Sequence, residues 1–216
     1  MSDLRLAVES AEAVPFAAVP LVAFKLRITN SPREEVIHTI ALKVQIQLEV
    51  SHRQYNPDEQ ARLRDLFGEP DRWGQTLRSM LWTHVSSIVP RFTGSTVTEL
   101  HVPCTFDFNV AATKYFHGLG SGDIPLCFQF SGTVFYESAG GELQVSPISW
   151  DKESNYRLPV KVWKELMDEH YPNSAWLVLQ KDTFERLYRY KVDEGIPTWD
   201  EAVDRALQAR RETVRS

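Results

Sequence analysis

The chain has 216 residues, of which 43% are hydrophobic and 25% charged, as is ordinary for a globular protein. This length allows one large domain or two small ones, and the formal net charge of −5 argues against nucleic acid as the main partner. Two cysteines are too few for a disulfide framework, and no stretch reaches the roughly 18 apolar residues of a membrane-spanning helix. Because the N-terminus also lacks the apolar run of a signal peptide, we expect a cytoplasmic protein without membrane insertion.

The first part of the chain has the pattern of β-strands. Short strands are predicted over residues 4–9 and 21–29. The clearest strand covers 38–50, where five apolar residues alternate with four polar ones between Leu42 and Val50. This period of two predicts one buried and one solvent-facing side, which favours an antiparallel sheet.

A helical insertion is predicted next, over residues 56–83. Asn56 suits the N-cap of a first helix, Pro57 suits its first position, and Gly68 ends it. A second short helix is expected over 71–83, because its apolar residues recur at roughly helical spacing.

The chain then returns to β-structure. The Gly140-Gly141 pair, flanked by two β-like segments, indicates a hairpin. The segments predicted here are a strand at 85–89, a long strand over 97–113 interrupted near Pro103, a loop over 114–123, a strand over 124–137 and a strand over 150–156.

The last 60 residues read as helices. Pro159 opens a segment with Trp163, Leu166 and Met167 on one apolar stripe. Asp182 is expected to cap a second helix, and the T-x-x-E pattern at Thr198 predicts the capping box of a third.

Together these elements predict a single domain of the α+β class over 1–216. Its β-rich body, 1–156, is expected to form an antiparallel β-sandwich or open barrel that contains the helical insertion at 56–83. The helical C-terminal layer, 157–216, is expected to pack against the sheet through its aromatic residues.

Few residues suggest chemistry. His101-x-x-Cys104, with His117 and Cys127 at a distance, contains metal-ligand types, but residues three apart on a strand point to opposite faces. A cysteine could also act as a catalytic nucleophile with one of these histidines as its base. The sequence, however, contains no G-x-S-x-G nucleophile elbow. We therefore interpret them as buried thiols and surface imidazoles, and a disulfide stays open as an alternative. No metal, cofactor or catalytic residue is predicted, and a hydrolase ranks last among the functions.

Two further features have structural explanations. The loop Gly118–Asp123 resembles a phosphate cradle, but it joins two predicted strands and lacks a lysine, which favours a hairpin loop. Asp107 alternates with two phenylalanines and is expected on the polar face of its strand.

The aromatic residues of the C-terminal part allow more than one interpretation. Packing between the helices and the sheet is favoured over a ligand pocket or a partner surface, and the residues concerned are Trp163, Trp176, Tyr188, Tyr190 and Trp199. Residues beside the main stripe and in the turn that follows are the candidates for contact with a partner, namely Arg189, Tyr190, Ile196 and Pro197.

Four motifs between Trp163 and Ala202 complete the pattern: W-K-E-L-M, Y-P-N-S-A-W-L, F-E-R-L-Y-R-Y-K and G-I-P-T-W-D-E-A. With the β-rich body before them, they resemble an uncharacterised actinobacterial family that recurs near NiFe-hydrogenase genes. The resemblance implies no activity and no site residues. It implies an accessory protein for the assembly or maturation of a hydrogenase, with the hydrogenase or its maturation factors as the protein partner.

The sequence therefore predicts a non-catalytic accessory or protein-interaction protein. A small apolar-ligand-binding protein is the alternative, and a homo-oligomer is an open possibility. No basic cluster outside the mixed-charge C-terminal tail indicates nucleic-acid binding.

Overall fold

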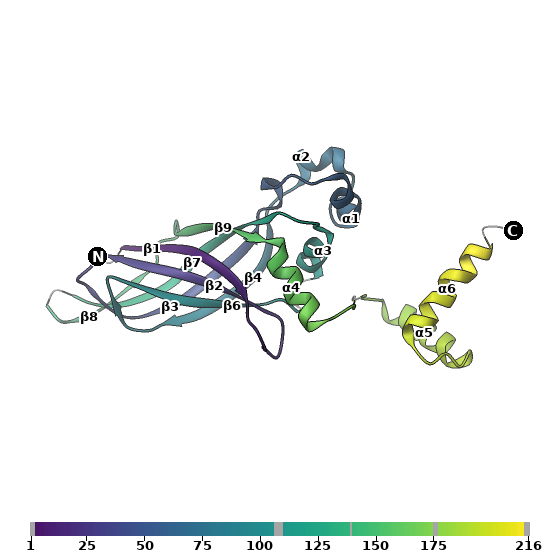
Figure 1. The fold of residues 1–216 in the computed structure, drawn as a ribbon. Coiled ribbons are helices and arrows are strands. Elements are labelled where there is room, and N and C mark those ends of the chain that lie inside the picture. The colour runs from purple at the N-terminus through teal and green to yellow at the C-terminus, as the bar shows by residue number, and fades with distance from the viewer. Residues whose placement is uncertain (1–2, 106–109, 139, 175–176, 214–216) are drawn as a thin grey trace. The chain divides into compact units, whose positions relative to one another are not determined.

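The computed structural model describes residues 3–105, 110–138, 140–174 and 177–213, with side chains through residue 209 (Figure 1). Its contacts divide the chain into two compact units, Met1–Asn173 and Ser174–Ser216, called the body and the helical unit here. The body holds two antiparallel, open sheets with helices, so the predicted α+β class with a sandwich is confirmed. Among the described residues, no helix is both long and apolar enough to cross a bilayer.

The smaller sheet has three antiparallel strands in the order β1–β2–β6. One face of β2 is almost fully buried, since Phe24, Leu26 and Ile28 have no exposed surface. The strands are β1 (Asp3–Ala13), β2 (Leu21–Ser31) and β6 (Ser95–Pro103).

The larger sheet has the order β4–β3–β7–β8, with β5 also paired to β3 and β9 to β7. The alternation predicted along β3 is confirmed, because Val44 and Ile46 are buried while Lys43 is exposed on the opposite face. The strands are β3 (Val36–Leu48), β4 (Met80–Val89), β5 (Phe92–Thr93), β7 (Asp123–Glu137), β8 (Leu143–Pro147) and β9 (Glu153–Pro159).

The two sheets pack face to face around Phe24. Its ring meets Phe128 of β7 at a centroid distance of 5.0 Å, Tyr156 of β9 at 5.9 Å and Trp82 of β4 at 6.2 Å, all edge to face. At one edge the sheets are also joined by a hydrogen bond of 3.0 Å from the Val8 N–H to Ser154 Oγ.

Helices gather at one end of the sandwich (Figure 1). Helix α4 contacts β1, β2 and β9 and buries Trp163, Leu166 and Met167, as its predicted stripe requires. The helical segments of the body are η1 (Val50–His52), α1 (Pro57–Phe67), η2 (Pro70–Arg72), α2 (Trp73–Thr76), α3 (Val110–Gly118) and α4 (Val160–His170).

The predicted helix over 71–83 is wrong beyond Thr76. From Met80 the chain pairs with β3, and the extra residue Trp82 forms a bulge that leaves its indole only 3% exposed. Strand pairing along β3 therefore outweighs the helical spacing of the apolar residues.

The predicted strand over 97–113 is confirmed up to Pro103 and wrong from Val110 onward. Residues from Val110 form α3, because Ala112, Tyr115 and Phe116 have helical spacing and are all buried. The loop Gly118–Asp123 consequently follows a helix and not a strand. Asp107 lies outside the described residues.

A buried ion pair fastens that loop to the first helix. Arg53 and Glu59 have side chains only 9% and 3% exposed, and Arg53 Nη2 lies 2.7 Å from Glu59 Oε1. Arg53 also donates to the carbonyl oxygens of Ser121 and Asp123, while the Gly120 N–H donates to Glu59 at 2.7 Å. The pair thus links η1, α1 and the start of β7.

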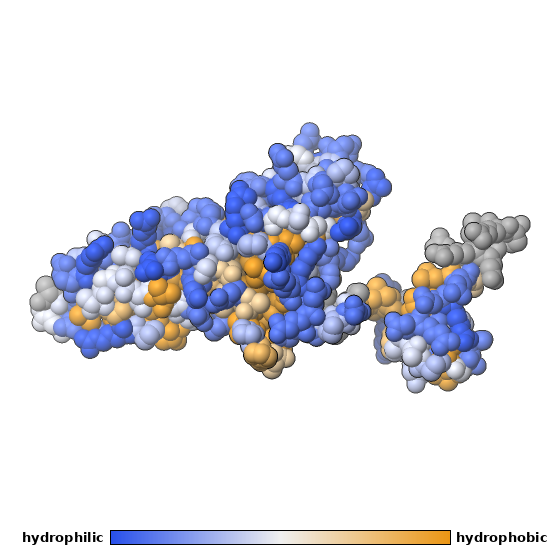
Figure 2. All heavy atoms as spheres, viewed as in Figure 1, coloured by the Kyte–Doolittle hydropathy of each residue, from blue (hydrophilic) through white to orange (hydrophobic). Residues whose placement is uncertain are grey.

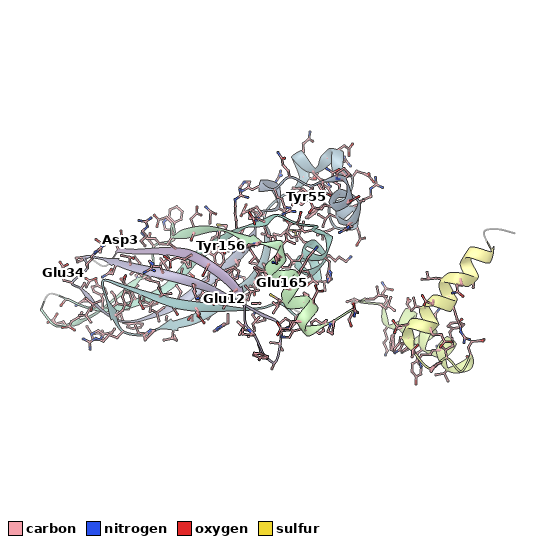
Figure 3. All side chains as sticks on the ribbon, in the orientation of Figure 1. Asp3, Glu12, Glu34, Tyr55, Tyr156 and Glu165 are labelled. Atoms are coloured by element: carbon pink, nitrogen blue, oxygen red, sulfur yellow. The ribbon has the colours of Figure 1, made fainter. Side chains whose placement is uncertain are left out.

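Close packing surrounds this pair. A Cβ at Gly118 would clash with the Leu63 side chain, so any larger residue at this position would force Leu63 to move. Tyr55, labelled near the helical insertion in Figure 3, has its hydroxyl 3.0 Å from the Tyr115 hydroxyl and donates to the Val50 carbonyl. The capping box of α1 is complete, as the sequence predicts for Asn56.

Removing one member of the buried pair should destabilise the body strongly. We expect Arg53→Ala to lower the free energy of unfolding by about 3–5 kcal/mol, because Glu59 would stay buried without its partner. Arg64→Ala is the matched control, since Arg64 pairs with Glu69 at the surface, where the effect should stay within about 0.5 kcal/mol. Urea denaturation measures both variants, and equal losses would contradict the buried role of Arg53.

The pair should also make stability depend on pH. Burial alone would raise the pKa of Glu59, but hydrogen bonds from the Gly120 and Asn56 N–H groups and the Arg53 charge lower it below 4.5. The ionised carboxylate therefore stabilises the fold above pH 4.5, and this contribution is lost as the pH falls through the folded pKa. The stability difference between wild type and Glu59→Gln should shrink from pH 6 to pH 3 in urea titrations. A constant difference would contradict the lowered pKa.

Candidate protein-binding surface

The helical unit contains two helices, α5 (Lys181–Asp193) and α6 (Trp199–Thr213). Gln180 is the N-cap of α5, so the predicted cap Asp182 lies in the first turn instead. For α6 the predicted cap is confirmed, because Thr198 Oγ1 accepts a hydrogen bond of 3.2 Å from the Glu201 N–H.

The turn between these helices is defined by backbone bonds. Gly195 has a φ of 64°, the left-handed conformation that commonly ends a helix. The Ile196 N–H then donates to the Lys191 carbonyl at 2.9 Å, and the Ile196 side chain is 3% exposed. This turn brings Trp199 against α5.

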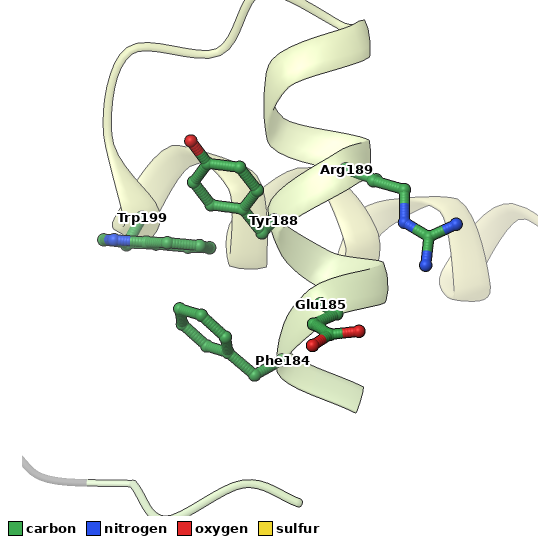
Figure 4. Close-up of a pocket in the computed structure, with 5 residues that line it drawn as sticks. All are labelled: Phe184, Glu185, Tyr188, Arg189 and Trp199. Carbon is green, nitrogen blue, oxygen red and sulfur yellow. The ribbon is translucent and has the colours of Figure 1, made fainter. Parts of the chain in front are cut away.

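Three aromatic rings from the two helices form a cluster (Figure 4). The ring of Trp199 lies 5.4 Å from Phe184 and 6.1 Å from Tyr188 between centroids. Lys191 Nζ lies 5.6 Å from the centre of the Trp199 ring, a cation–π contact. The cluster joins α5 to the start of α6.

Despite these contacts, the apolar side of the unit stays exposed. Phe184 is 47% exposed, Tyr188 52% and Val192 56%, although they share one stripe of α5. Figure 2 shows hydrophobic residues at the surface of this unit among hydrophilic ones. Other exposed apolar residues of the unit are Leu177, Val178, Trp199, Val203 and Leu207.

A surface hollow of about 340 Å³ lies on the aromatic cluster. Phe184, Tyr188 and Trp199 provide its apolar lining, and Glu185 and Arg189 stand beside them (Figure 4). Such a hollow, apolar in its lining and flanked by one charge of each sign, has the composition of a protein-binding site.

The four predicted contact residues fall in different places. Arg189 is exposed and lines the hollow, and Pro197 is exposed. Tyr190 is half-buried, and Ile196 is buried within the turn. From the sequence, Tyr188 and Trp199 are expected to pack against the sheet, whereas the structure places both with Phe184 around the hollow. The unit has more large aromatic residues than so short a segment can bury, and this excess is the sequence signal that could have identified them as exposed.

The candidates for metal or thiol chemistry do not converge. His101 is exposed beside Glu99, whereas Cys104 is buried and bonds to the Val102 carbonyl. His117 packs edge to face on Trp163. Both cysteines are free thiols, and the described part of the chain contains no group of three or more His, Cys, Asp or Glu residues that could hold a metal ion.

The outer face of the larger sheet carries polar side chains, as predicted from β3. Gln45 and Gln47 both donate to Gln129 Oε1 across β7, at 3.1 and 3.2 Å. His84 Nε2 on β4 lies 3.1 Å from Gln45 Oε1. These side chains satisfy one another and form a hydrogen-bonded row across three strands.

The comparisons with known proteins place the chain in a family. The model of a family of unknown function, DUF6084, matches residues 1–215. The chain belongs to this family. The family description states no activity, and no curated protein matches the DUF6084 chain.

Solved structures show distant likeness to this DUF6084 chain. IrmA from Escherichia coli is 13% identical, with a TM-score of 0.32, and the match covers 83% of this chain and 99% of IrmA. A protein described as late embryogenesis abundant is 15% identical, with a TM-score of 0.30 over 72% and 71% of the two chains. A protein described as ApaA from Bordetella pertussis is 13% identical, with a TM-score of 0.24 over 73% and 93%. At such TM-scores, the site must be argued from its own residues.

The two thiols should react slowly in the folded protein. Burial raises the pKa of Cys104 to about 12, and burial with the nearby Glu153 and Glu49 carboxylates raises that of Cys127 to about 11. At pH 8 less than about 1% of either is thiolate, the reactive form. A chromogenic thiol reagent should therefore label the folded chain at least about a hundredfold more slowly than the denatured chain. Rapid labelling of one thiol before unfolding would contradict this, and Cys127→Ala identifies which one.

Proposed function

We propose that this chain is a non-catalytic accessory protein that binds another protein through the exposed aromatic face of α5 and α6. The main support for this proposal is the apolar stripe of Phe184, Tyr188 and Val192, each of which is about half exposed beside a hollow. Complete burial of a large apolar side chain is worth roughly 1.5–3 kcal/mol, and these half-exposed side chains forgo about half of that. Contiguous exposed apolar surface rimmed by charges marks protein-binding sites more often than isolated exposed residues do.

The resemblance of the C-terminal motifs suggests which partner to test first. Those motifs include F-E-R-L-Y-R-Y-K, which spans the centre of α5. The finer proposal is that the partner belongs to the assembly or maturation machinery of a NiFe-hydrogenase in an actinobacterium, where the chain would act in the cytoplasm.

The observations on the thiols weigh against the hydrolase alternative. Raised pKa values keep Cys104 and Cys127 protonated near neutral pH, whereas a catalytic cysteine needs a lowered pKa. The proposal therefore assigns the chain a binding role and gives no residue a catalytic one.

Binding of a small apolar ligand is a second candidate, favoured by the hollow on the aromatic cluster. Its volume of about 340 Å³ is at the lower end of ligand pockets. Near Trp163, where the sequence suggested such a site, the interior leaves only about 10 Å³, room for no more than one water molecule. Of these two places, the hollow of the helical unit is the one with room for a ligand.

Affinity capture with surface variants tests the proposal. Tagged wild type should retain hydrogenase subunits or maturation factors from a host grown on hydrogen. Phe184→Ser/Tyr188→Ser should lose at least about 90% of them, because it removes the apolar anchors. Asp182→Ser/Arg186→Ser is the matched control, since these exposed residues lie on the opposite side of α5. Circular dichroism confirms that each variant keeps its helices. Equal retention by all three proteins would sink the proposal.

A further inference from the structure

The helical unit does not complete a core of its own. It has 43 residues, close to the lower limit at which a chain can form a stable core without support. Among its described residues, Ile196 and Ala202 are the buried hydrophobic ones. Its apolar stripe therefore needs a partner for stability as well as for function.

Charge permits that partner to be identical. Residues 174–216 contain eight basic and eight acidic side chains, so the unit is neutral, and the whole net charge of −5 resides in residues 1–173. Two helical units can approach without net repulsion, whereas a strongly charged partner would gain no long-range attraction from the unit.

The pattern along α5 is self-complementary. Phe184, Tyr188 and Val192 form the apolar row, and Glu185 and Arg189 form a charged row directly beside it (Figure 4). The two charges are one turn apart, about 6 Å along the axis. If a second α5 runs antiparallel across a two-fold axis at the level of residue 187, each Glu185 faces an Arg189, and each apolar row faces an apolar row.

The charges of the row are available for such a contact. Glu185 lies 3.7 Å from Lys181 in an exposed pair on the same helix, an arrangement that contributes little stability alone. Arg189 lines the hollow at its side. A large side chain from a second copy could fill this hollow and exclude water from the aromatic cluster.

We infer that the occupant of this surface is a second copy of the same chain, packed through antiparallel α5 helices across a two-fold axis. The inference rests on the proposed function, because it takes the α5 face as the protein-binding surface, and it names a second copy as the partner there in place of a hydrogenase-assembly protein. The two copies of α5 and α6 form a four-helix assembly whose core includes both apolar rows. The dimer carries two sandwich bodies, so a further partner can bind it bivalently.

Charge reversal in the full chain tests the inference. By sedimentation at about 10–100 µM, wild type should be dimeric. Glu185→Arg and Arg189→Glu, each made alone, should weaken the dimer at least about tenfold, because each creates two like-charge contacts across the axis. The double variant Glu185→Arg/Arg189→Glu should dimerise as wild type does. Arg186→Glu, on the opposite side of α5, is the matched control and should have no effect.

Mixing supplies the decisive readout. A Glu185→Arg chain mixed with an Arg189→Glu chain should form a heterodimer of wild-type stability, since every contact across the axis again pairs opposite charges. Failure of the mixture to dimerise, or single variants that dimerise like wild type, would overturn the antiparallel α5 interface. A monomeric wild type would overturn self-association itself. In that case the capture experiment above still decides whether the same face binds another protein.

Discussion

The packing of aromatic rings around Phe24 is the interaction on which the body depends. Phe24 sits between the two sheets and contacts Trp82, which in turn lies 5.0 Å from Phe116 of α3. Phe116 lies 5.3 Å from Trp163 of α4, so one chain of rings runs from the sandwich into the helices that cover its end. Because edge-to-face and tilted contacts fix ring orientation as well as distance, the same packing that holds the sheets together also positions α3 and α4.

Sequence periodicity predicted the parts of this body where one pattern dominates. β3 alternates strictly because it is a central strand with one face in the core, and α4 carries an unbroken apolar stripe. The first half of β4 was hidden because the bulge at Trp82 breaks the alternation and leaves a spacing that also suits a helix, whereas its second half was predicted as a strand over 85–89. α3 was hidden because its short stripe follows directly on a strand-like stretch. The first miss depends on pairing with β3 and the second on packing of α3 against α1 and β4, and both involve residues that are distant in the sequence.

The candidate site was predictable only in part for a related reason. Helical periodicity identifies which side of α5 is apolar, but it does not say what covers that side. The structure places Arg189 at the exposed side of α5 beside the stripe and buries Ile196 within the turn, where its N–H donates to the Lys191 carbonyl. Counting the residues that could cover the stripe would have predicted its exposure better. Two short helices, each with one hydrophobic stripe, cannot bury both stripes completely against each other.

The contrast between the two units suggests where function resides. The body contains internal polar pairs, such as Arg53 with Glu59 in the interior and Gln45 with Gln129 on the outer face. Near Trp163, the space left between the packed side chains of the body is only about 10 Å³. In the helical unit the largest side chains are instead half exposed around a hollow, beside charges of opposite sign one turn apart. Exposing these apolar side chains to water costs free energy, and burial against a partner would offset that cost. The α5 face is therefore the part of this fold that stability alone does not explain.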